Sequence, residues 1–324
     1  MSESDRIKAR GLRDAWLQQL VEEPLQPVLP IIDAHHHLWD HPGSRYLLEQ
    51  LLGDTGSGHN VVATVYVECG SMYRPHGPAA LRPVGETAFA DAVARQALEV
   101  AGGPKGPTRV AAGIVAFADL LLGDAVQEVL LAHRAASPER LRGIRHAAGF
   151  DPHDAIANSH ADPPAGMLRD PTFRRGFARL AEHGLVFDAW LYHHQIPELI
   201  DLARAFPDTT IVLDHFGGPL GVGPYEGRRD AILTQWRHDI ARLAQCPNVV
   251  AKLGGLAMAV NGFGWHRRSA PPSSSELAKA GRPYYLHTID CFGPARCMFE
   301  SNFPMDRISC SYGVLWNAFK RLAA

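Results

Sequence analysis

Eight short apolar segments recur along the 324 residues of this chain, and a helical pattern follows most of them. Near-continuous apolar runs of this length predict strands that are buried on both faces, as in a parallel sheet. Eight such strands interleaved with helices favour an α/β fold, a (β/α)8 TIM barrel, over a doubly wound sheet. The segments are 30–38, 60–69, 109–118, 141–146, 185–192, 210–216, 248–254 and 297–303.

The predicted helices between these strands carry recognisable start signals. Asp170 followed by Pro171 is typical of a capping residue and a first-turn proline, and it predicts a helix over 171–183. Phe173 and Phe177 share one face of that helix, which we expect to be buried. Further helices are predicted over 86–101, 197–206, 230–245 and 308–322.

The connections differ in length on the two ends of the predicted barrel. Those from helix to strand are brief, whereas those from strand to helix are long: 70–85, 147–169, 217–229 and 255–272. Barrel active sites lie at the carboxyl ends of the strands, on the strand-to-helix loops. The long loops therefore predict the functional end of the barrel.

We divide the chain into two parts. Residues 1–28 are predicted to form an N-terminal helical extension, and residues 29–324 a single barrel domain. The extension is amphipathic, with Trp16, Leu17 and Leu20. The sequence leaves open whether it closes the bottom of the barrel or joins a partner.

Composition excludes several classes of function. The net charge is −2 and there is no block of like charge, so we expect neither a nucleic-acid partner nor a membrane-surface partner. No apolar stretch approaches the ~20 residues that span a bilayer. The five cysteines are scattered without a paired motif, which predicts reduced thiols in a cytoplasmic protein. A small-molecule substrate is expected, and a homo-oligomer is left open.

The run Ile31 to Asp40 places two histidines, His35 and His37, at the end of the first predicted strand. Side chains alternate between the two faces of a strand, so these two histidines point the same way, toward a metal ion or a substrate carbonyl. Asp33 is expected to face away from them and to have a capping or orienting role. A harmless surface cluster of histidines is the other interpretation of this run.

Polar residues end nearly every predicted strand, which a purely structural barrel does not need because buried ionisable groups are costly. Arg145 suits recognition of a substrate carboxylate, and a plain salt-bridge partner is the other interpretation of this arginine. Lys252, Tyr73 and Tyr192 are further candidates for substrate contacts. The strand-end set is His35, His37, Glu68, Arg145, His146, Asp188, Tyr192, His193, His194, Asp214, His215, Lys252, Glu300, Ser301, Asn302 and Asp306.

The strings IIDAHHHLWD, TIVLDHFGGP and MFESNFPMD resemble the amidohydrolase superfamily, and most closely its amidohydrolase 2 branch of TIM-barrel hydrolases. The resemblance covers about Asp33 to Leu322. That branch contains sugar lactonases and a pyrone-dicarboxylate lactonase. The resemblance implies that His35, His37 and His215 hold a divalent metal, Zn²⁺ or Mn²⁺, or act on the substrate without a metal.

Two departures from the family pattern affect the expected chemistry. Asn302 stands where many members have a general-base aspartate, and an amide orients water but accepts no proton. The base is then His215, Glu68, Asp306 or a metal hydroxide, and Asn302 positions the water. Members of the branch often have a metal-ligating histidine at the end of strand 5. His193 and His194 lie near that position but slightly after the end of the predicted strand.

These residues favour hydrolysis of a small carboxylated or sugar-derived lactone by attack of water on its carbonyl. A metal-dependent decarboxylase or hydratase of a small unsaturated or aromatic acid is the alternative, since such lyases need no hydrolytic water. A barrel that binds a ligand without turning it over is the third hypothesis, and only Asn302 supports it.

Overall fold

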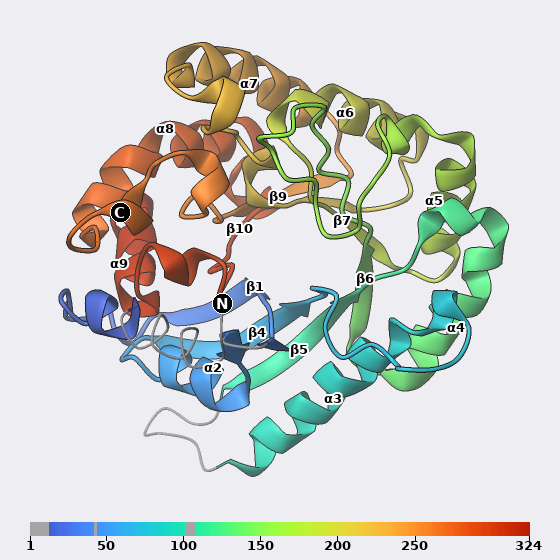
Figure 1. The fold of residues 1–324 in the computed structure, drawn as a ribbon, viewed down its shortest axis with the longest axis horizontal. Coiled ribbons are helices and arrows are strands. Elements are labelled where there is room, and N and C mark those ends of the chain that lie inside the picture. The colour runs from blue at the N-terminus through green and yellow to red at the C-terminus, as the bar shows by residue number, and fades with distance from the viewer. Residues whose placement is uncertain (1–12, 42–43, 101–107) are drawn as a thin grey trace.

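The computed structural model describes residues 13–41, 44–100 and 108–324. Eight parallel strands pair in chain order, and helices surround them in a nearly closed ring (Figure 1). The predicted TIM barrel is confirmed, and each predicted segment contains one strand. The strands are β1 (Pro30–His36), β4 (Asn60–Val67), β5 (Arg109–Ala116), β6 (Leu141–Arg145), β7 (Val186–Ala189), β8 (Ile211–Leu213), β9 (Val249–Leu253) and β10 (Cys297–Phe299).

Several strands end earlier than their apolar segments predict. In the segment 210–216 the extended backbone stops at Leu213. His215 and Phe216 have positive φ angles of 52° and 59°, which strand backbone cannot adopt. The chain therefore turns sharply at the end of β8, and His215 belongs to this turn. A two-stranded sheet, β2 (Trp39–His41) and β3 (Ser44–Tyr46), follows β1.

The expected helices are present, and their ends differ by a few residues. Asp170 accepts hydrogen bonds from Thr172 N and Phe173 N, as its capping position predicts. Phe173 and Phe177 are fully buried. The helices are α2 (Leu48–Thr55), α3 (Val84–Glu99), α4 (Val126–Ala136), α5 (Pro171–Glu182), α6 (Ile196–Ala205), α7 (Arg229–Leu243), α8 (Ser274–Phe292) and α9 (Tyr312–Ala323). Residue 101 of the predicted helix 86–101 lies outside the described residues.

Helices α2, α4 and α8 are additions to the predicted set. Helix α4 begins after Ala125, which offers no side-chain cap, so its start carries no sequence signal. Helix α8 begins with a capping box between Ser273 and Glu276, but Pro283 in its interior argues against a helix. The structure accommodates this proline within a 19-residue helix.

The barrel closes between β1 and the segment after β10 through a few hydrogen bonds. His37 N donates to Phe303 O at 2.8 Å, and Asn302 N donates to His35 O at 2.9 Å. Asp33 Oδ1 accepts from Ser301 N at 2.8 Å, and its other oxygen accepts from a tyrosine hydroxyl of α9. Asp33 thus has the orienting role that was expected of it.

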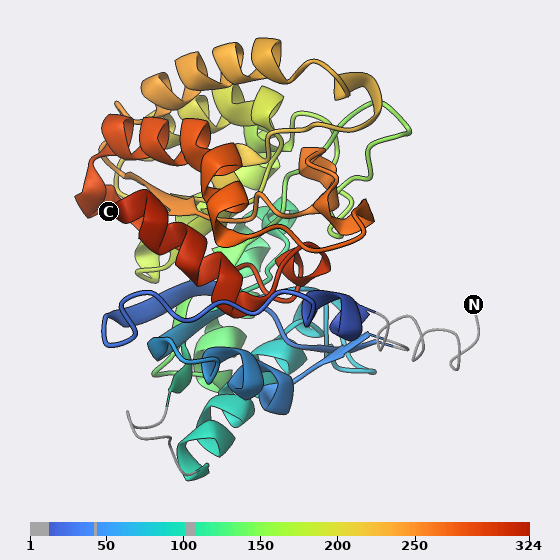
Figure 2. The same ribbon diagram turned by 90° about the vertical axis from the view of Figure 1, so that its left-hand side faces the viewer.

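The described part of the N-terminal extension runs beside α9 (Figure 2). At its start, Asp14 pairs with Arg307 at 2.7 Å and Trp16 Nε1 donates to Arg268 O at 2.9 Å. These partners lie in strand-to-helix segments, so the start of the extension lies at the functional end of the barrel. Residues 1–12 of the extension lie outside the described part, and the boundary at residue 28 stays a prediction.

Two other expectations can be compared with the structure. The five cysteines are free thiols, as their spacing predicts. Within the described ranges, no helix has the length and apolar character needed to cross a membrane.

Candidate active site

Five ionisable side chains from different strands converge at the carboxyl end of the barrel. They are buried to 0–1% exposure, and each is the penultimate residue of a strand or the residue directly after one. A group of ionisable residues this deep is costly unless its members pair or carry out chemistry. The five are His35, Glu68, Asp188, Asp214 and Glu300.

The two histidines of the first strand point to the same side, as their spacing predicts. His35 Nε2 lies 3.1 Å from His37 Nε2, and His37 Nδ1 lies 2.7 Å from Val67 O. His36, between them, faces the other way and bonds Thr64 Oγ1. Burial, together with nearby positive charges, lowers the pKa of His35 and His37 well below the usual value, so both imidazoles are neutral.

Glu68 and Arg145 form a buried ion pair. Arg145 Nε donates to Glu68 Oε1 at 2.6 Å, and a second guanidinium nitrogen donates to the Glu68 carbonyl oxygen. His160, from the long loop after β6, bonds the other carboxylate oxygen at 2.8 Å. Burial raises the pKa of Glu68, but Arg145 and His160 outweigh burial and bring the pKa to about 2. A carboxylate held in this way is a weak proton acceptor.

Lys252 lies at the centre of a second cluster. Its Nζ is 2.5 Å from Asp188 Oδ2, 3.0 Å from Asp214 Oδ1 and 3.1 Å from His35 Nδ1. Burial disfavours the ammonium, but the surrounding carboxylates outweigh burial and raise the pKa of Lys252 above its usual value. Lys252 therefore carries a fixed positive charge inside the barrel.

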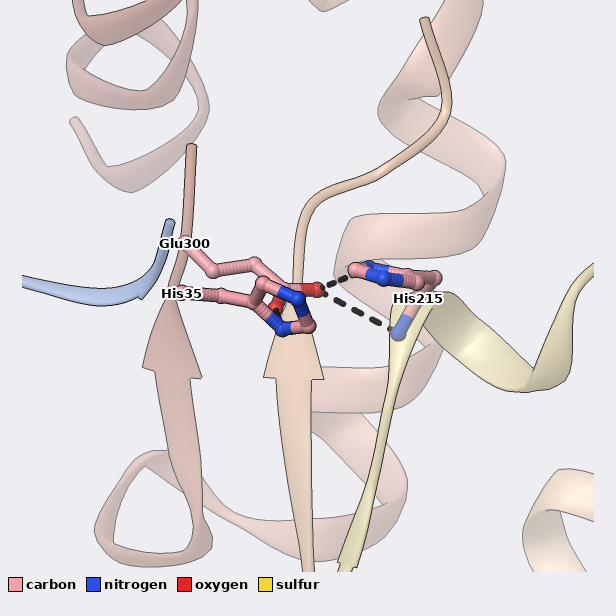
Figure 3. A group of neighbouring side chains, drawn as sticks. All are labelled: His35, His215 and Glu300. Carbon is pink, nitrogen blue, oxygen red and sulfur yellow. Dashed lines mark hydrogen bonds and ion pairs between the residues drawn. The ribbon is translucent and has the colours of Figure 1, made fainter. Parts of the chain in front are cut away.

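His215 is held by Glu300, from the segment after β10. Glu300 Oε1 lies 2.6 Å from His215 Nδ1 and accepts from His215 N at 3.2 Å (Figure 3). Two glycines after β9 make room for this pair. A Cβ on Gly254 would lie 2.4 Å from Glu300 Cγ, and a Cβ on Gly255 would lie 2.5 Å from His215 Cγ. The Gly-Gly sequence is thus a steric requirement of the site.

Asn302 and Asp306 are joined by a hydrogen bond. Asn302 Nδ2 donates to Asp306 Oδ1 at 3.0 Å, and Ala257 N donates to Asp306 Oδ2 at 3.2 Å. Burial raises the pKa of Asp306 to about 7. Asn302 Oδ1 is buried without a hydrogen-bond partner.

A cavity of about 970 Å³ opens over this group of residues. His37, Arg145, Tyr192, His215 and Asn302 line its inner part. Of the four residues expected to contact substrate, Arg145 and Tyr192 thus face the cavity. Lys252 and Tyr73 are not among the lining residues, and neither are Glu68 and Asp306. A substrate contact of Tyr73 stays a prediction. The outer part is lined by residues that include Arg13, Asp14, Trp39, Trp190, Met258 and Met305.

Three other histidines have positions that the sequence did not specify. His193 Nδ1 accepts from Leu220 N at 3.3 Å, and His194 Nε2 lies 3.1 Å from Phe150 O, so both stabilise loops. His160, which sequence reasoning missed, reaches the site through Glu68. The amino-acid sequence gives no signal for the contact between His160 and Glu68, because this contact depends on how the long loop after β6 folds.

The described residues offer two groups of three donors that could hold a metal ion, and both include His35. The group with Asp188 and Asp214 does not fit a metal, because Lys252 Nζ lies within 3.1 Å of a donor atom of each member. The group with His215 and Glu300 fits better, because Lys252 Nζ contacts His35 but pairs with neither other member, and Glu300 Oε2 is buried without a hydrogen-bond partner. Carboxylate and imidazole donors suit Zn²⁺ and Mn²⁺.

A barrel with this polar cluster at its carboxyl end is typical of TIM-barrel enzymes. The family model Amidohydro_2, described as amidohydrolase, matches residues 32–324. The chain belongs to this family of hydrolases, as the strings quoted above indicated.

Relatives of the chain share nearly its whole length. An uncharacterized protein, y4mH, of Sinorhizobium fredii is 34% identical over 91% of this chain and 91% of its own. An L-fucono-1,5-lactonase of Burkholderia multivorans is 28% identical over 90% and 88%. The crystal structure of an amidohydrolase from Burkholderia multivorans with bound zinc superposes with a TM-score of 0.66, at 25% identity over 91% and 92%.

Proposed function

We propose that this hydrolase opens a small carboxylated or sugar-derived lactone by attack of water on the ring carbonyl. The observation that carries the proposal is the meeting of His215, Arg145 and Asn302 at the inner wall of one cavity. Together they offer a proton acceptor, a cation and an amide oxygen on the same side of a bound substrate. The similarity to an L-fucono-1,5-lactonase supports the substrate class.

His215 is the best placed general base of the four candidates. Its Nδ1 bonds the Glu300 carboxylate at 2.6 Å, which fixes the proton on that nitrogen and leaves Nε2 to accept a proton from water. Glu68 is neutralised by Arg145, and Asp306 lies outside the cavity lining. Neither carboxylate is as well placed to meet a water molecule beside the substrate.

Asn302 positions the attacking water in this proposal. Its Oδ1 has no hydrogen-bond partner in the protein, and Asn302 is one of the residues that line the cavity. An amide oxygen in this state accepts a hydrogen bond from water and orients it, while the proton is transferred elsewhere. Asn302 thus replaces the orienting function of the usual aspartate but not its basicity.

Arg145 binds the substrate's negative charge. Two of its nitrogens, Nε and Nη2, donate to Glu68. The third, Nη1, lies 3.5 Å from His35 Nε2 and 3.5 Å from Asp214 Oδ2, so the guanidinium is only loosely held on that side. A guanidinium in the cavity wall stabilises a substrate carboxylate, or the oxyanion that forms at the carbonyl. A divalent cation held by His215 and Glu300 would supply Lewis-acid polarisation of the carbonyl when bound, and the His215 ring would then be a ligand in place of the base.

A lactone panel tests the proposal. The purified protein is assayed at several pH values against sugar lactones and carboxylated lactones, with and without a chelator. We expect turnover of at least one class, and a loss of about 100-fold or more in kcat for His215→Asn. His238→Asn, at a side chain that is 64% exposed, is the control. Absence of lactone turnover by folded protein would overturn the proposal.

The alternative of a decarboxylase or hydratase is favoured by one observation, the amide of Asn302 in place of a carboxylate. A reaction that needs no water activation tolerates this replacement. Release of carbon dioxide from an aromatic or enoic acid, without lactone turnover, would support this alternative.

A further inference from the structure

Apart from a long contact of 3.5 Å between Arg145 Nη1 and His35 Nε2, the hydrogen bonds around the His-x-His pair run in one direction and end on a backbone carbonyl. His37 Nδ1 lies 2.7 Å from Val67 O, which only accepts, so His37 Nδ1 carries the proton. Lys252 Nζ, which only donates, lies 3.1 Å from His35 Nδ1, so the proton of His35 is on Nε2. His35 Nε2 is therefore the donor to His37 Nε2, 3.1 Å away.

The same reasoning fixes the other nitrogen of His35. With the proton on Nε2, Nδ1 accepts, and Lys252 Nζ lies 3.1 Å from it as the donor. This assignment also explains why Glu300 Oε2, 3.0 Å from His35 Nδ1, forms no hydrogen bond, because neither atom has a proton to offer. The tautomers of both histidines therefore follow from the two groups at the ends of this row of hydrogen bonds, the Lys252 ammonium and the Val67 carbonyl.

Lys252 Nζ also meets the carboxylates of Asp188 at 2.5 Å and Asp214 at 3.0 Å. The ammonium donates hydrogen bonds to Asp188 Oδ2 and His35 Nδ1, and Asp214 Oδ1 is its ion-pair partner. Those acceptors are the three donors of the second potential metal group, His35 with Asp188 and Asp214. The geometry points to a built-in cation: we propose that the Lys252 ammonium takes the place of a metal ion in this group and sets the tautomers of the His-x-His pair.

Two consequences follow for the site. In the native protein no lone pair of His35 or His37 is free for a metal, because each ring has one donor and one acceptor already engaged. Removing the ammonium frees His35 Nδ1 and leaves two buried carboxylates without their cation. That combination of an imidazole nitrogen and two carboxylates suits Zn²⁺.

Zinc binding to Lys252→Met tests the proposal without any assay of activity. Isothermal titration of metal-stripped protein with Zn²⁺ should show about one additional equivalent in Lys252→Met, or an affinity at least roughly tenfold higher than in the native chain. Zinc should also raise the melting temperature of this variant more than that of the native protein. Lys279→Met, at an exposed lysine of α8, is the matched control and should bind zinc as the native chain does.

Equal zinc stoichiometry and affinity in the native chain, Lys252→Met and Lys279→Met would overturn the proposal. Lys252→Gln keeps a hydrogen-bond donor without the charge, and it replaces Lys252→Met in this comparison if the methionine variant fails to fold.

Histidine NMR of the native protein tests the tautomers directly and requires neither a variant nor a metal. In ¹⁵N-histidine spectra we expect His35 protonated on Nε2 alone and His37 protonated on Nδ1 alone. A His35 ring protonated on Nδ1 would contradict the donor role of Lys252. Because the readouts are metal binding and tautomers, their outcome is independent of whether the substrate is a lactone.

Discussion

A single carboxylate oxygen of Glu300 holds His215 at two points, its ring Nδ1 at 2.6 Å and its backbone nitrogen at 3.2 Å. The ring is thereby held in one orientation, and the carboxylate stabilises the imidazolium that forms when the ring accepts a proton. Glu300→Gln retains the acceptor oxygen but loses the charge. We expect kcat to fall by about tenfold or more with little change in KM, as measured by steady-state kinetics on the lactone that the native enzyme hydrolyses.

The exposed residue Glu128 provides the control, because Glu128→Gln makes the same chemical change on the surface of α4. A Glu300→Gln enzyme with the native kcat would show that the charge of Glu300 has no part in catalysis.

Gly255 is predicted to be a position where one methyl group disables the site. A Cβ there would lie 2.5 Å from His215 Cγ, and the φ angle of +76° adds strain. Gly255→Ala should therefore displace the His215 ring and lower kcat by about tenfold or more. Gly264→Ala is a matched control, because Gly264 has a φ of +69° with no atom within 4 Å of its Cβ position. Equal kinetics in the two variants would contradict the steric argument.

The arrangement of the barrel could be predicted because each strand leaves a local trace in the sequence. Apolar runs mark all eight strands, and the short connections at one end identify the other end as functional. The identity of the strand-end residues followed directly, which placed His35, Arg145 and His215 in one region. Strand alternation alone also gave the common direction of His35 and His37.

The pairing within the site could not be predicted, because it depends on distances across the barrel. Lys252 was expected to contact substrate, but it is enclosed by two aspartates and His35. His160 lies 92 residues from its partner Glu68, on a loop without periodic pattern. The role of Glu300 required the turn at His215, whose positive φ has no sequence signature outside glycine and asparagine-like residues.

Stability in acid is predicted to depend on Glu68. Arg145 and His160 bring its folded pKa to about 2, against an ordinary value of 4.5. A carboxylate with a lowered folded pKa contributes stability that is fully present above pH 4.5 and is lost as the pH falls toward 2. This lowering of the Glu68 pKa on folding corresponds to about 3 kcal/mol in the free energy of unfolding. Glu68→Gln should be less stable than the native chain at pH 7 and should lose less stability on acidification.

Urea unfolding followed at pH 7, 5, 4 and 3 measures this difference in the free energy of unfolding. Glu128→Gln again serves as the surface control and should follow the native curve. Parallel curves for the native chain and Glu68→Gln across this range would mean that the ion pair with Arg145 does not shift the titration of Glu68.

The hydrogen bond between Asn302 and Asp306 predicts that restoring the usual family aspartate is harmful here. Asn302→Asp would place two buried carboxylates 3.0 Å apart, where they repel and the donated hydrogen bond is lost. We expect a loss of about 1–3 kcal/mol in the free energy of unfolding and lower lactone turnover than in the native chain. Thermal unfolding and steady-state kinetics measure the two effects.

Exchanging the two side chains separates repulsion from position. The double variant Asn302→Asp/Asp306→Asn keeps one carboxylate and one amide in contact, so most of the lost stability should return. It also moves the carboxylate from the buried position 306 to position 302 in the cavity lining, where it can contact water. If Asn302→Asp instead gains a hydrolytic activity that the native chain lacks, the native chain is a binding barrel and His215 is not its base. A native chain that hydrolyses lactones, with activity reduced in Asn302→Asp, supports an amide-positioned water and a histidine base in one site.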